Sequence, residues 1–222
     1  MVSINVVSRF ASAASLMLAV TALAGCDNNP TKDKAQATVA EPVAVAAPSA
    51  PTAAAAAAKY VFSNADSKVS FVGAKVTRKH DGSFGTFNGA IDLVDGKPEN
   101  GAVTVDIDIA SLTADDPKLT GHLKSPDLLD AAKFPKAHFA STSVKAGGDK
   151  GATHTVTGNL TLHGVTKSIS FPATIKMNGA ATDVNAEFGI NRKDFGIVYP
   201  GMPNDLIKDE ILIKLEIHGK KA

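Results

Sequence analysis

The chain offers few side chains at spacings that suit catalysis or metal binding. Its 222 residues contain no G-x-S-x-G elbow, no H-E-x-x-H pair and no glycine-rich phosphate loop. Asp106 and Asp108 could form a carboxylate pair for acid–base chemistry, but they alternate with valines and isoleucines and should therefore face water. The six histidines never fall at the close spacing of a metal site; they are His80, His122, His138, His154, His163 and His218. These observations favour a protein that is not an enzyme and that holds no metal or cofactor.

Cys26, the only cysteine, is the residue best placed for a covalent modification. It follows the small residues Ala24 and Gly25, which end an apolar stretch that begins after Arg9. A basic start, an apolar stretch and small residues before a cleavage site describe a secretory signal, and a cysteine at this point resembles the signal of bacterial lipoproteins. The interrupted apolar stretch is shorter than the roughly 20 residues of a membrane-spanning helix. We therefore expect residues 1–25 to be a signal peptide and Cys26 to be lipidated, on the periplasmic side of the cell envelope.

The balance of charge bears on the partners. The chain has 23 basic residues and 22 acidic ones, and residues 1–25 contain one base, Arg9, and no acid. The remainder is therefore formally neutral. Binding to nucleic acid and polybasic attachment to anionic lipid both need clustered basic charge, so neither is expected. Attachment to a membrane would come from acyl chains on Cys26. With one cysteine no internal disulfide is possible, and stability must come from an apolar core.

Residues 26–58 have the composition of a flexible tether. They are rich in alanine, include Pro30, Pro42, Pro48 and Pro51, and contain few large apolar residues. Such a segment cannot bury enough surface to offset the entropy cost of ordering it, and as a coil it would span roughly 30 Å. We predict a disordered tether over 26–58 and a folded domain over 59–222. Asp27 resembles a residue that retains some bacterial lipoproteins in the inner membrane, but the choice between the inner and the outer membrane stays open.

Beyond Lys59, apolar residues recur at every second position, which is typical of strands with one buried face. Val103, Val105 and Ile107, for example, alternate with polar residues. Pairs such as Asp81-Gly82, Asp95-Gly96 and His163-Gly164 are typical of tight turns, and the short connections favour antiparallel neighbours. We predict eight strands, near 68–77, 84–95, 102–110, 137–146, 152–162, 165–177, 182–193 and 209–218.

One segment, Asp116–Lys133, breaks this pattern. Its leucines recur at three- and four-residue spacings and indicate a helical segment. Eight amphipathic antiparallel strands are best accommodated by a closed all-β barrel, which leaves no exposed edge, while a two-sheet sandwich is the rival architecture. Interior positions combine phenylalanines with small residues such as Gly73, Gly89 and Gly158. A small barrel of this kind either holds one small ligand or is filled by side chains, and the sequence leaves both possibilities open.

Six short motifs follow one another along the folded domain. They are Val69-Ser70-Phe71, the stretches 85–89, 122–125 and 134–139, the ten-residue block 158–167, and the stretch 191–196. Together they resemble the YceI-like family, lipocalin-like periplasmic proteins that bind polyisoprenoids, and the resemblance covers 59–222. It implies an eight-stranded antiparallel barrel with a short helical segment near the opening and a long apolar tunnel. The chain departs from the family at 126–130, where relatives commonly carry paired phenylalanines; this bears on ligand length or head-group preference if the segment lines the mouth.

The resemblance implies a membrane-tethered binding or carrier protein for an isoprenoid lipid, quinone-like or a polyprenyl phosphate, without catalysis. Arg192 or Lys124 is a candidate partner for a phosphate head group. Two alternatives stay open: a filled barrel that serves as a protein-interaction module in the envelope, and a hydrolase or isomerase with titratable groups inside the barrel. The residues expected to contact the ligand are Phe71, Phe87, Ile91, Phe139, Leu160, Phe171, Ile175, Phe188 and Phe195.

Overall fold

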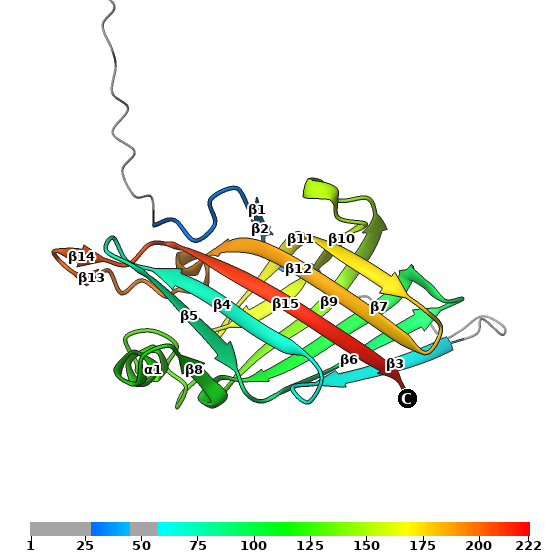
Figure 1. Ribbon diagram of the computed structural model, residues 1–222, viewed down its shortest axis with the longest axis horizontal. Coiled ribbons are helices and arrows are strands. Elements are labelled where there is room, and N and C mark those ends of the chain that lie inside the picture. Colours follow the sequence, from blue (N-terminus) through cyan, green and yellow to red (C-terminus); the bar gives the residue numbers. More distant parts are fainter. Residues whose placement is uncertain (1–27, 45–56) are drawn as a thin grey trace, which may run out of the picture.

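The computed structural model describes residues 28–44 and 57–222, and most of these residues belong to strands wound around one long barrel (Figure 1). In order around the ring, the strands are β3 (Ala57–Ser63), β6 (Phe87–Val94), β7 (Lys97–Asp108), β9 (Lys136–Ala146), β10 (His154–Leu162), β11 (Val165–Met177), β12 (Ala181–Asn191) and β15 (Glu210–Lys221). Neighbouring strands run antiparallel, and β15 pairs with both β12 and β3, which closes the ring. The predicted eight-stranded antiparallel barrel is confirmed, and the rival sandwich is wrong.

Tight turns connect several of these strands where the sequence predicts them. Asp95-Gly96 joins β6 to β7 and His163-Gly164 joins β10 to β11, and all four residues have positive φ, as two-residue hairpins require. The predicted turn at Asp81-Gly82 is wrong, because these residues lie inside β5 (Lys79–Phe84). β5 pairs with β4 (Lys68–Ala74), and the chain reverses at residues 75–78 instead.

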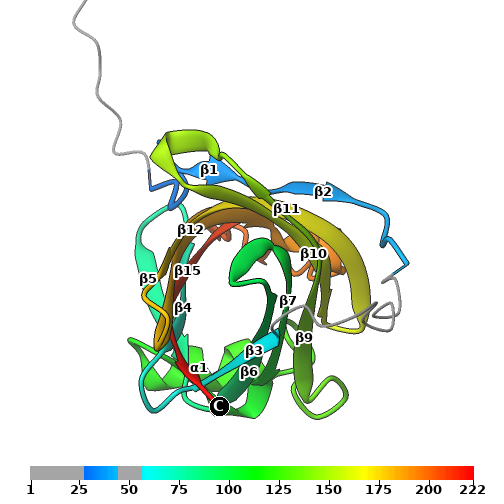
Figure 2. The same ribbon diagram turned by 90° about the vertical axis from the view of Figure 1, so that its right-hand side faces the viewer.

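Residues 28–44 contradict the expectation of a disordered tether for this part of the chain. β1 (Ala35–Gln36) pairs in parallel with β12, and β2 (Thr38–Ala40) pairs antiparallel with β11 (Figure 2). The two wall strands pair with each other only along 174–177 and 182–185, so the segment bridges them where they diverge. Free strand edges carry unpaired backbone donors and acceptors. Pairing with these edges explains why a segment of low hydrophobicity is ordered.

The amino-terminal predictions are only partly within the described residues. The predicted signal peptide, 1–25, and the predicted lipidation site, Cys26, lie outside them, as does the part of the tether at 45–56. The barrel begins at Ala57, two residues before the predicted domain boundary. β3 was not among the eight predicted strands, and the predicted strand near 68–77 corresponds to β4, which pairs with β15 beside the ring.

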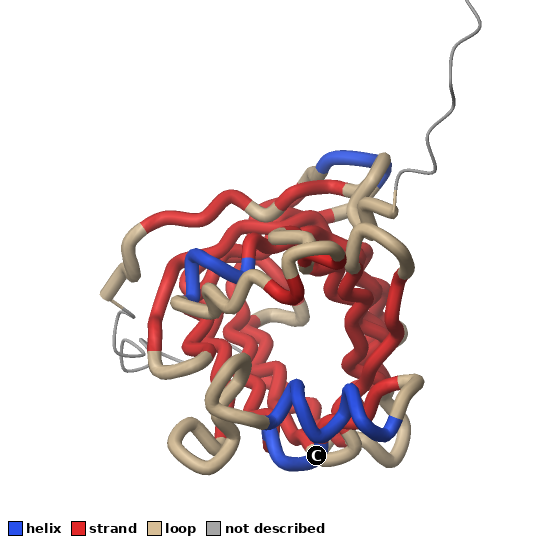
Figure 3. The backbone as a smooth tube through the Cα atoms, turned by 90° about the vertical axis from the view of Figure 1, so that its left-hand side faces the viewer, coloured by secondary structure: helices blue, strands red, loops and turns tan. Residues whose placement is uncertain are grey.

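A short helix lies across one end of the barrel (Figure 3). α1 (Pro117–Lys124) begins with Pro117 in its first turn, and the Asp116 side chain accepts a hydrogen bond from the Leu119 amide at 2.9 Å. It ends at Lys124, because Pro126 disfavours the helical conformation of Ser125, whose backbone is extended. The helix is therefore shorter than the predicted segment 116–133. The other short elements are η1 (Ile109–Ser111), β8 (Leu112–Ala114), η2 (Asp149–Gly151), η3 (Arg192–Phe195), β13 (Gly201–Met202) and β14 (Asp205–Leu206).

Candidate ligand-binding site

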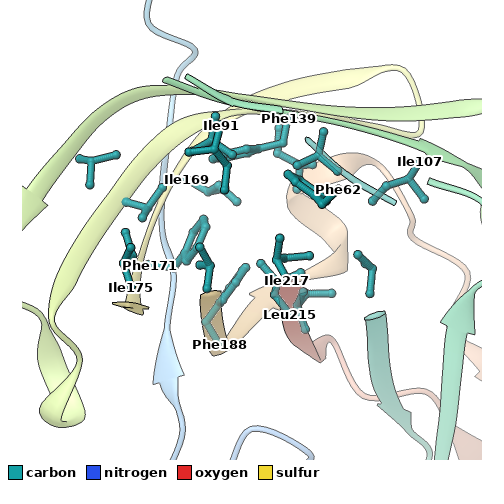
Figure 4. Close-up of a pocket in the computed structure, with 18 of the residues that line it drawn as sticks. Phe62, Ile91, Ile107, Phe139, Ile169, Phe171, Ile175, Phe188, Leu215 and Ile217 are labelled. Atoms are coloured by element: carbon teal, nitrogen blue, oxygen red, sulfur yellow. The ribbon is translucent and has the colours of Figure 1, made fainter. Parts of the chain in front are cut away.

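The barrel encloses an apolar cavity of about 170 Å³, which we call the inner cavity. All eight strands of the ring contribute to its wall, and none of the described residues that line it is charged. In Figure 4 the labelled side chains gather around one space, and the sticks are carbon throughout. The labelled residues are Phe62, Ile91, Ile107, Phe139, Ile169, Phe171, Ile175, Phe188, Leu215 and Ile217.

Glycines in the wall keep two phenylalanine rings out of the middle of this cavity. Phe62 on β3 is paired directly with Gly89 on β6, and a Cβ built on Gly89 would lie 2.1 Å from the ring. The Phe139 ring likewise covers Gly158, where a Cβ would lie 2.4 Å from the ring. Each ring therefore occupies the space that a side chain at the glycine would take, so it lies against the wall. Of the small interior residues noted in the sequence, Gly89 and Gly158 make room for phenylalanine rings, and a lumen remains beside these rings.

Three phenylalanines, Phe139, Phe171 and Phe188, form a chain of aromatic contacts along the wall. The Phe171 and Phe188 rings are nearly parallel, with centroids 4.1 Å apart, and Phe139 is tilted against Phe171 at 5.8 Å. Offset and tilted pairs of this kind are favourable beyond the area that they bury. These contacts fix the side chains of β9, β11 and β12 where they face the cavity.

A second cavity of about 360 Å³, the outer cavity, lies at the helix end of the barrel. Leu119 and Leu123 of α1 line it, together with Met202 and Tyr199. The inner and outer cavities adjoin, since four side chains line both: Phe84, Leu162, Ile190 and Ile213. Unlike the inner cavity, the outer one has charged or titratable residues in its wall, namely Lys75, His80, His122, Arg192 and Tyr199.

Arg192 is buried, and its guanidinium forms three hydrogen bonds within the protein. It is 4% exposed, and its guanidinium donates to the Ile197 carbonyl at 2.6 Å, to the Lys208 carbonyl at 3.2 Å and to Asp209 Oδ1 at 3.2 Å. Burial lowers the pKa of Arg192 below its ordinary value, and the neighbouring Asp209 opposes that shift. Three of its five N–H donors fix the ends of the loop after η3, so its contacts argue against a role as phosphate partner. Lys124, the other candidate, lines neither cavity.

His80 is likewise fixed at the edge of the outer cavity. Its Nδ1 lies 2.9 Å from Asp115 Oδ1, and its Nε2 accepts a hydrogen bond from Arg78 Nε at 3.0 Å. The hydrogen bond with His80 lowers the pKa of Asp115 below its ordinary value of 3.8, against a smaller opposing effect of burial. With both ring nitrogens occupied, His80 ties β5 to the start of α1 and does not present a free base to the cavity.

Comparison with known proteins places the chain in a family. A family model described as a YceI-like domain matches residues 60–219. The chain belongs to the YceI-like family. A UPF0312 protein of Pseudomonas putida is 39% identical over 139 residues, which is 60% of this chain and 71% of the relative. A UPF0312 protein of Pseudomonas savastanoi is 41% identical over 128 residues, covering 54% and 65%.

Solved structures share the YceI-like barrel. BcnA of Burkholderia cenocepacia is 26% identical, with a TM-score of 0.62 over 70% of this chain and 97% of that one. A polyisoprenoid-binding domain from Saccharophagus degradans, implicated in plant cell wall breakdown, is 16% identical, with a TM-score of 0.58 over 74% and 98%. A Campylobacter jejuni YceI mutant with a monobromobimane guest is 24% identical, with a TM-score of 0.56 over 64% and 84%. At these lower identities the likeness concerns the fold.

The structure brings most of the predicted site residues to the two cavities. Phe71 lines the outer cavity. Phe87 and Phe195 line neither; they are 2% and 0% exposed and belong to the packed core. The predicted residues that line the inner cavity are Ile91, Phe139, Leu160, Phe171, Ile175 and Phe188. Contact between any of these residues and a ligand stays a prediction.

The sequence reasoning missed part of the wall of the YceI-like barrel. Phe62 lies on β3, a strand that was not predicted, so nothing placed it inside. Ile213, Leu215 and Ile217 share one face of β15 and line the inner cavity. Their alternation in the sequence was a usable signal, but it does not separate a wall that faces open space from a filled core.

Two negative findings apply to residues 28–44 and 57–222. In these ranges no group of three or more His, Cys, Asp or Glu side chains is arranged to hold a metal ion. Nor does any helix there combine the length and the apolar character needed to cross a membrane.

Proposed function

We propose that the protein is a non-catalytic binding or carrier protein for an isoprenoid lipid. The main support for this proposal is the inner cavity, which is lined by apolar side chains inside a YceI-like barrel. The polyisoprenoid-binding domain from Saccharophagus degradans, which has the same fold, supports the choice of ligand class. Burying an apolar chain stabilises the complex by roughly 25 cal/mol per Å². Methyl and methylene groups form no hydrogen bonds, so selection would depend on length and branching.

The size of the inner cavity itself favours a guest. By the cost measured for cavities in other protein cores, about 170 Å³ of apolar space that no side chain fills destabilises a fold by about 4 kcal/mol. A lipid chain in the cavity would recover part of that free energy. The alternative of a filled barrel that only binds protein partners is disfavoured, because a core packed to native density would leave no such space.

The wall of the inner cavity also argues against catalysis. Apart from Ser70 and Thr182, every residue that lines it is apolar. General acid–base chemistry needs a titratable group within hydrogen-bond reach of the reacting atom. A hydrolase or isomerase would have to work in the outer cavity, where Arg192 and His80 are held by their own partners.

We further propose that the protein is tethered to a bacterial membrane on the periplasmic side through acyl chains on Cys26. The support is the sequence pattern of residues 1–26, a short apolar run with small residues before the cysteine. More than one acyl chain is needed for stable anchoring. A quinone-like lipid or a polyprenyl phosphate would be the ligand, and the membrane, inner or outer, would be its reservoir.

A pair of tryptophan variants tests the cavity proposal. Val105 lines the inner cavity from β7, whereas its neighbour Thr104 is exposed on the outer face of the same strand. Val105→Trp should narrow the cavity and lower the amount of bound lipid several-fold, while Thr104→Trp should load like the wild type. Lipid extracted from each purified protein and identified by mass spectrometry measures the loading. Circular dichroism confirms that both variants fold.

Two results would contradict the proposal. One is a wild-type protein that carries no isoprenoid after purification and takes up none when a polyprenol is added. The other is a folded Val105→Trp variant that loads as much lipid as Thr104→Trp.

A further inference from the structure

Large exposed hydrophobic side chains gather at one end of the barrel. Among the described residues there are six, and four of them lie on the turn after β4 or on the stretch between η3 and β15. We call these four the apolar tip: Val76 (53% exposed), Val198 (64%), Met202 (59%) and Leu206 (47%). The other two, Val43 and Val61, lie elsewhere on the chain, at 54% and 43%.

The two turns that carry the apolar tip are joined by hydrogen bonds and an ion pair. The Val76 amide donates to the Leu206 carbonyl at 3.0 Å, which joins the turn after β4 to the β13–β14 hairpin. Asp205 strengthens the junction: Thr77 Oγ1 donates to it at 2.8 Å, and Lys75 Nζ lies 3.2 Å from it. Two turns that hold each other in this way present their apolar side chains outward in a fixed arrangement, although water should disfavour that exposure.

The apolar tip also borders the mouth of the ligand site. Met202 is part of the tip and lines the outer cavity, and Tyr199 and Lys75, beside the tip in sequence, line it as well. A lipid that leaves the outer cavity on this side would therefore meet the apolar tip before it meets water.

The amino-terminal end of the described chain arrives at the same place. Asn28 Nδ2 donates to the Val76 carbonyl at 2.8 Å. Only one residue separates Asn28 from Cys26, and two residues of extended chain span at most about 7 Å. An acyl anchor on Cys26 would thus hold the apolar tip close to the surface of the membrane.

We propose that the apolar tip docks on the surface of a lipid bilayer and places the outer cavity against it for exchange of the ligand. This inference rests on the proposed lipid-carrier function and on the proposed anchor. Val76, Val198, Met202 and Leu206 enter the interfacial region, as the apolar faces of peripheral membrane proteins do. Lys79, which is exposed beside the tip, can add a contact with an anionic head group, whereas Lys75 is paired with Asp205.

Single tryptophans test where the bilayer lies. The chain has no tryptophan, so one introduced residue reports only its own surroundings. Val76→Trp and Val43→Trp form a matched pair, because the two valines are almost equally exposed. Each full-length variant is purified as the cell delivers it and reconstituted with phosphatidylethanolamine–phosphatidylglycerol vesicles, with and without brominated acyl chains. We expect the emission of Val76→Trp to shift to the blue and to be quenched several-fold more than that of Val43→Trp. Equal quenching at both positions, or none at position 76, would overturn the proposal.

A second experiment measures exchange of the ligand. The double variant Val76→Glu/Leu206→Glu should bind as much lipid as the wild type, since neither residue lines a cavity, but should release it to vesicles several-fold more slowly. Val43→Glu is the control and should transfer lipid at the wild-type rate. An unchanged transfer rate in the double variant would count against docking, as would binding of the tip to an envelope protein with no quenching by brominated lipid.

Failure of the proposed function would be seen separately. Mass spectrometry of the amino-terminal peptide shows whether Cys26 carries acyl chains, and lipid extraction shows whether the barrel carries a ligand. The quenching at position 76 decides the docking proposal whatever these two measurements give.

Discussion

Phe62 and Gly89 face each other across β3 and β6, and the open lumen depends on pairs of this kind. A Cβ on Gly89 would lie 2.1 Å from the ring and 2.6 Å from the Thr104 carbonyl oxygen, which belongs to the backbone and cannot move freely. In Gly89→Val we expect the ring to turn into the inner cavity. Bound lipid should fall, and the stability should decrease by about 1–3 kcal/mol, as for other overpacked cores. Gly73→Ala is the control, since its nearest neighbour, Ile211 Cδ1, would be at an ordinary 3.5 Å. Lipid extraction and thermal unfolding measure both effects, and equal loading of the two variants would refute this account.

Asp115 gives the fold an acid-sensitive contact. The hydrogen bond with His80 lowers the pKa of Asp115 below 3.8. A lowered carboxyl pKa stabilises the fold above that ordinary value, and the stabilisation is lost as the pH falls through the lowered pKa. Asp115→Asn should therefore lower the free energy of unfolding near neutral pH, by at most about 1 kcal/mol because the side chain is 44% exposed. The difference from the wild type should shrink as the solution is acidified through the range below 3.8. Thermal unfolding as a function of pH tests this, and a difference that grows in acid would contradict it.

At the level of single residues, the sequence predicts which side chains face the interior of the barrel better than it predicts which of them line the cavity. Alternation places Phe87 and Phe171 on the inner face of their strands, and both are buried. Only Phe171 lines the inner cavity, although each belongs to a core cluster. Whether a buried side chain borders open space depends on side chains from strands far apart in the sequence, which periodicity in one strand cannot show.

At the level of elements, local patterns predict the long strands and miss those that depend on distant partners. β7 and β11 follow from alternation and from the turn residues at their ends. β3 was missed because an alanine-rich stretch precedes it, although Tyr60 and Phe62 alternate with less buried neighbours. Residues 28–44 have no strong pattern of their own. They are ordered by the diverging edges of β11 and β12, which come more than a hundred residues later.

The attachment of this amino-terminal segment can be tested with another matched pair. Val39 packs against the barrel core, opposite Ile169 of β11, whereas Val43 is exposed. Val39→Asp should release the segment, because it puts a carboxylate against apolar core side chains at a partly buried position. The Ala37 amide, which donates to the Gly189 carbonyl at 2.9 Å, should then exchange its hydrogen much faster. Val43→Asp should leave that exchange unchanged. Unaltered protection of Ala37 in Val39→Asp would show that the segment is held by other contacts.

At the level of the whole molecule, the cavity makes stability depend on its guest. If filling about 170 Å³ recovers most of about 4 kcal/mol, removal of the lipid should lower Tm by on the order of 10 °C for a domain of this size. Scanning calorimetry before and after extraction measures the shift, and added polyprenol should reverse it. Val105→Trp, with its cavity narrowed, should show a smaller shift. A protein that melts at the same temperature with and without lipid would rule out a stabilising guest.

The family match begins at Tyr60, yet the side of this barrel also includes residues 35–40. A chain shortened to the match would leave part of the edges of β11 and β12 without a pairing strand. Unpaired strand edges can pair with strands from other molecules. We therefore expect the truncated protein to self-associate, and its measured lipid uptake to reflect these aggregates rather than the intact barrel.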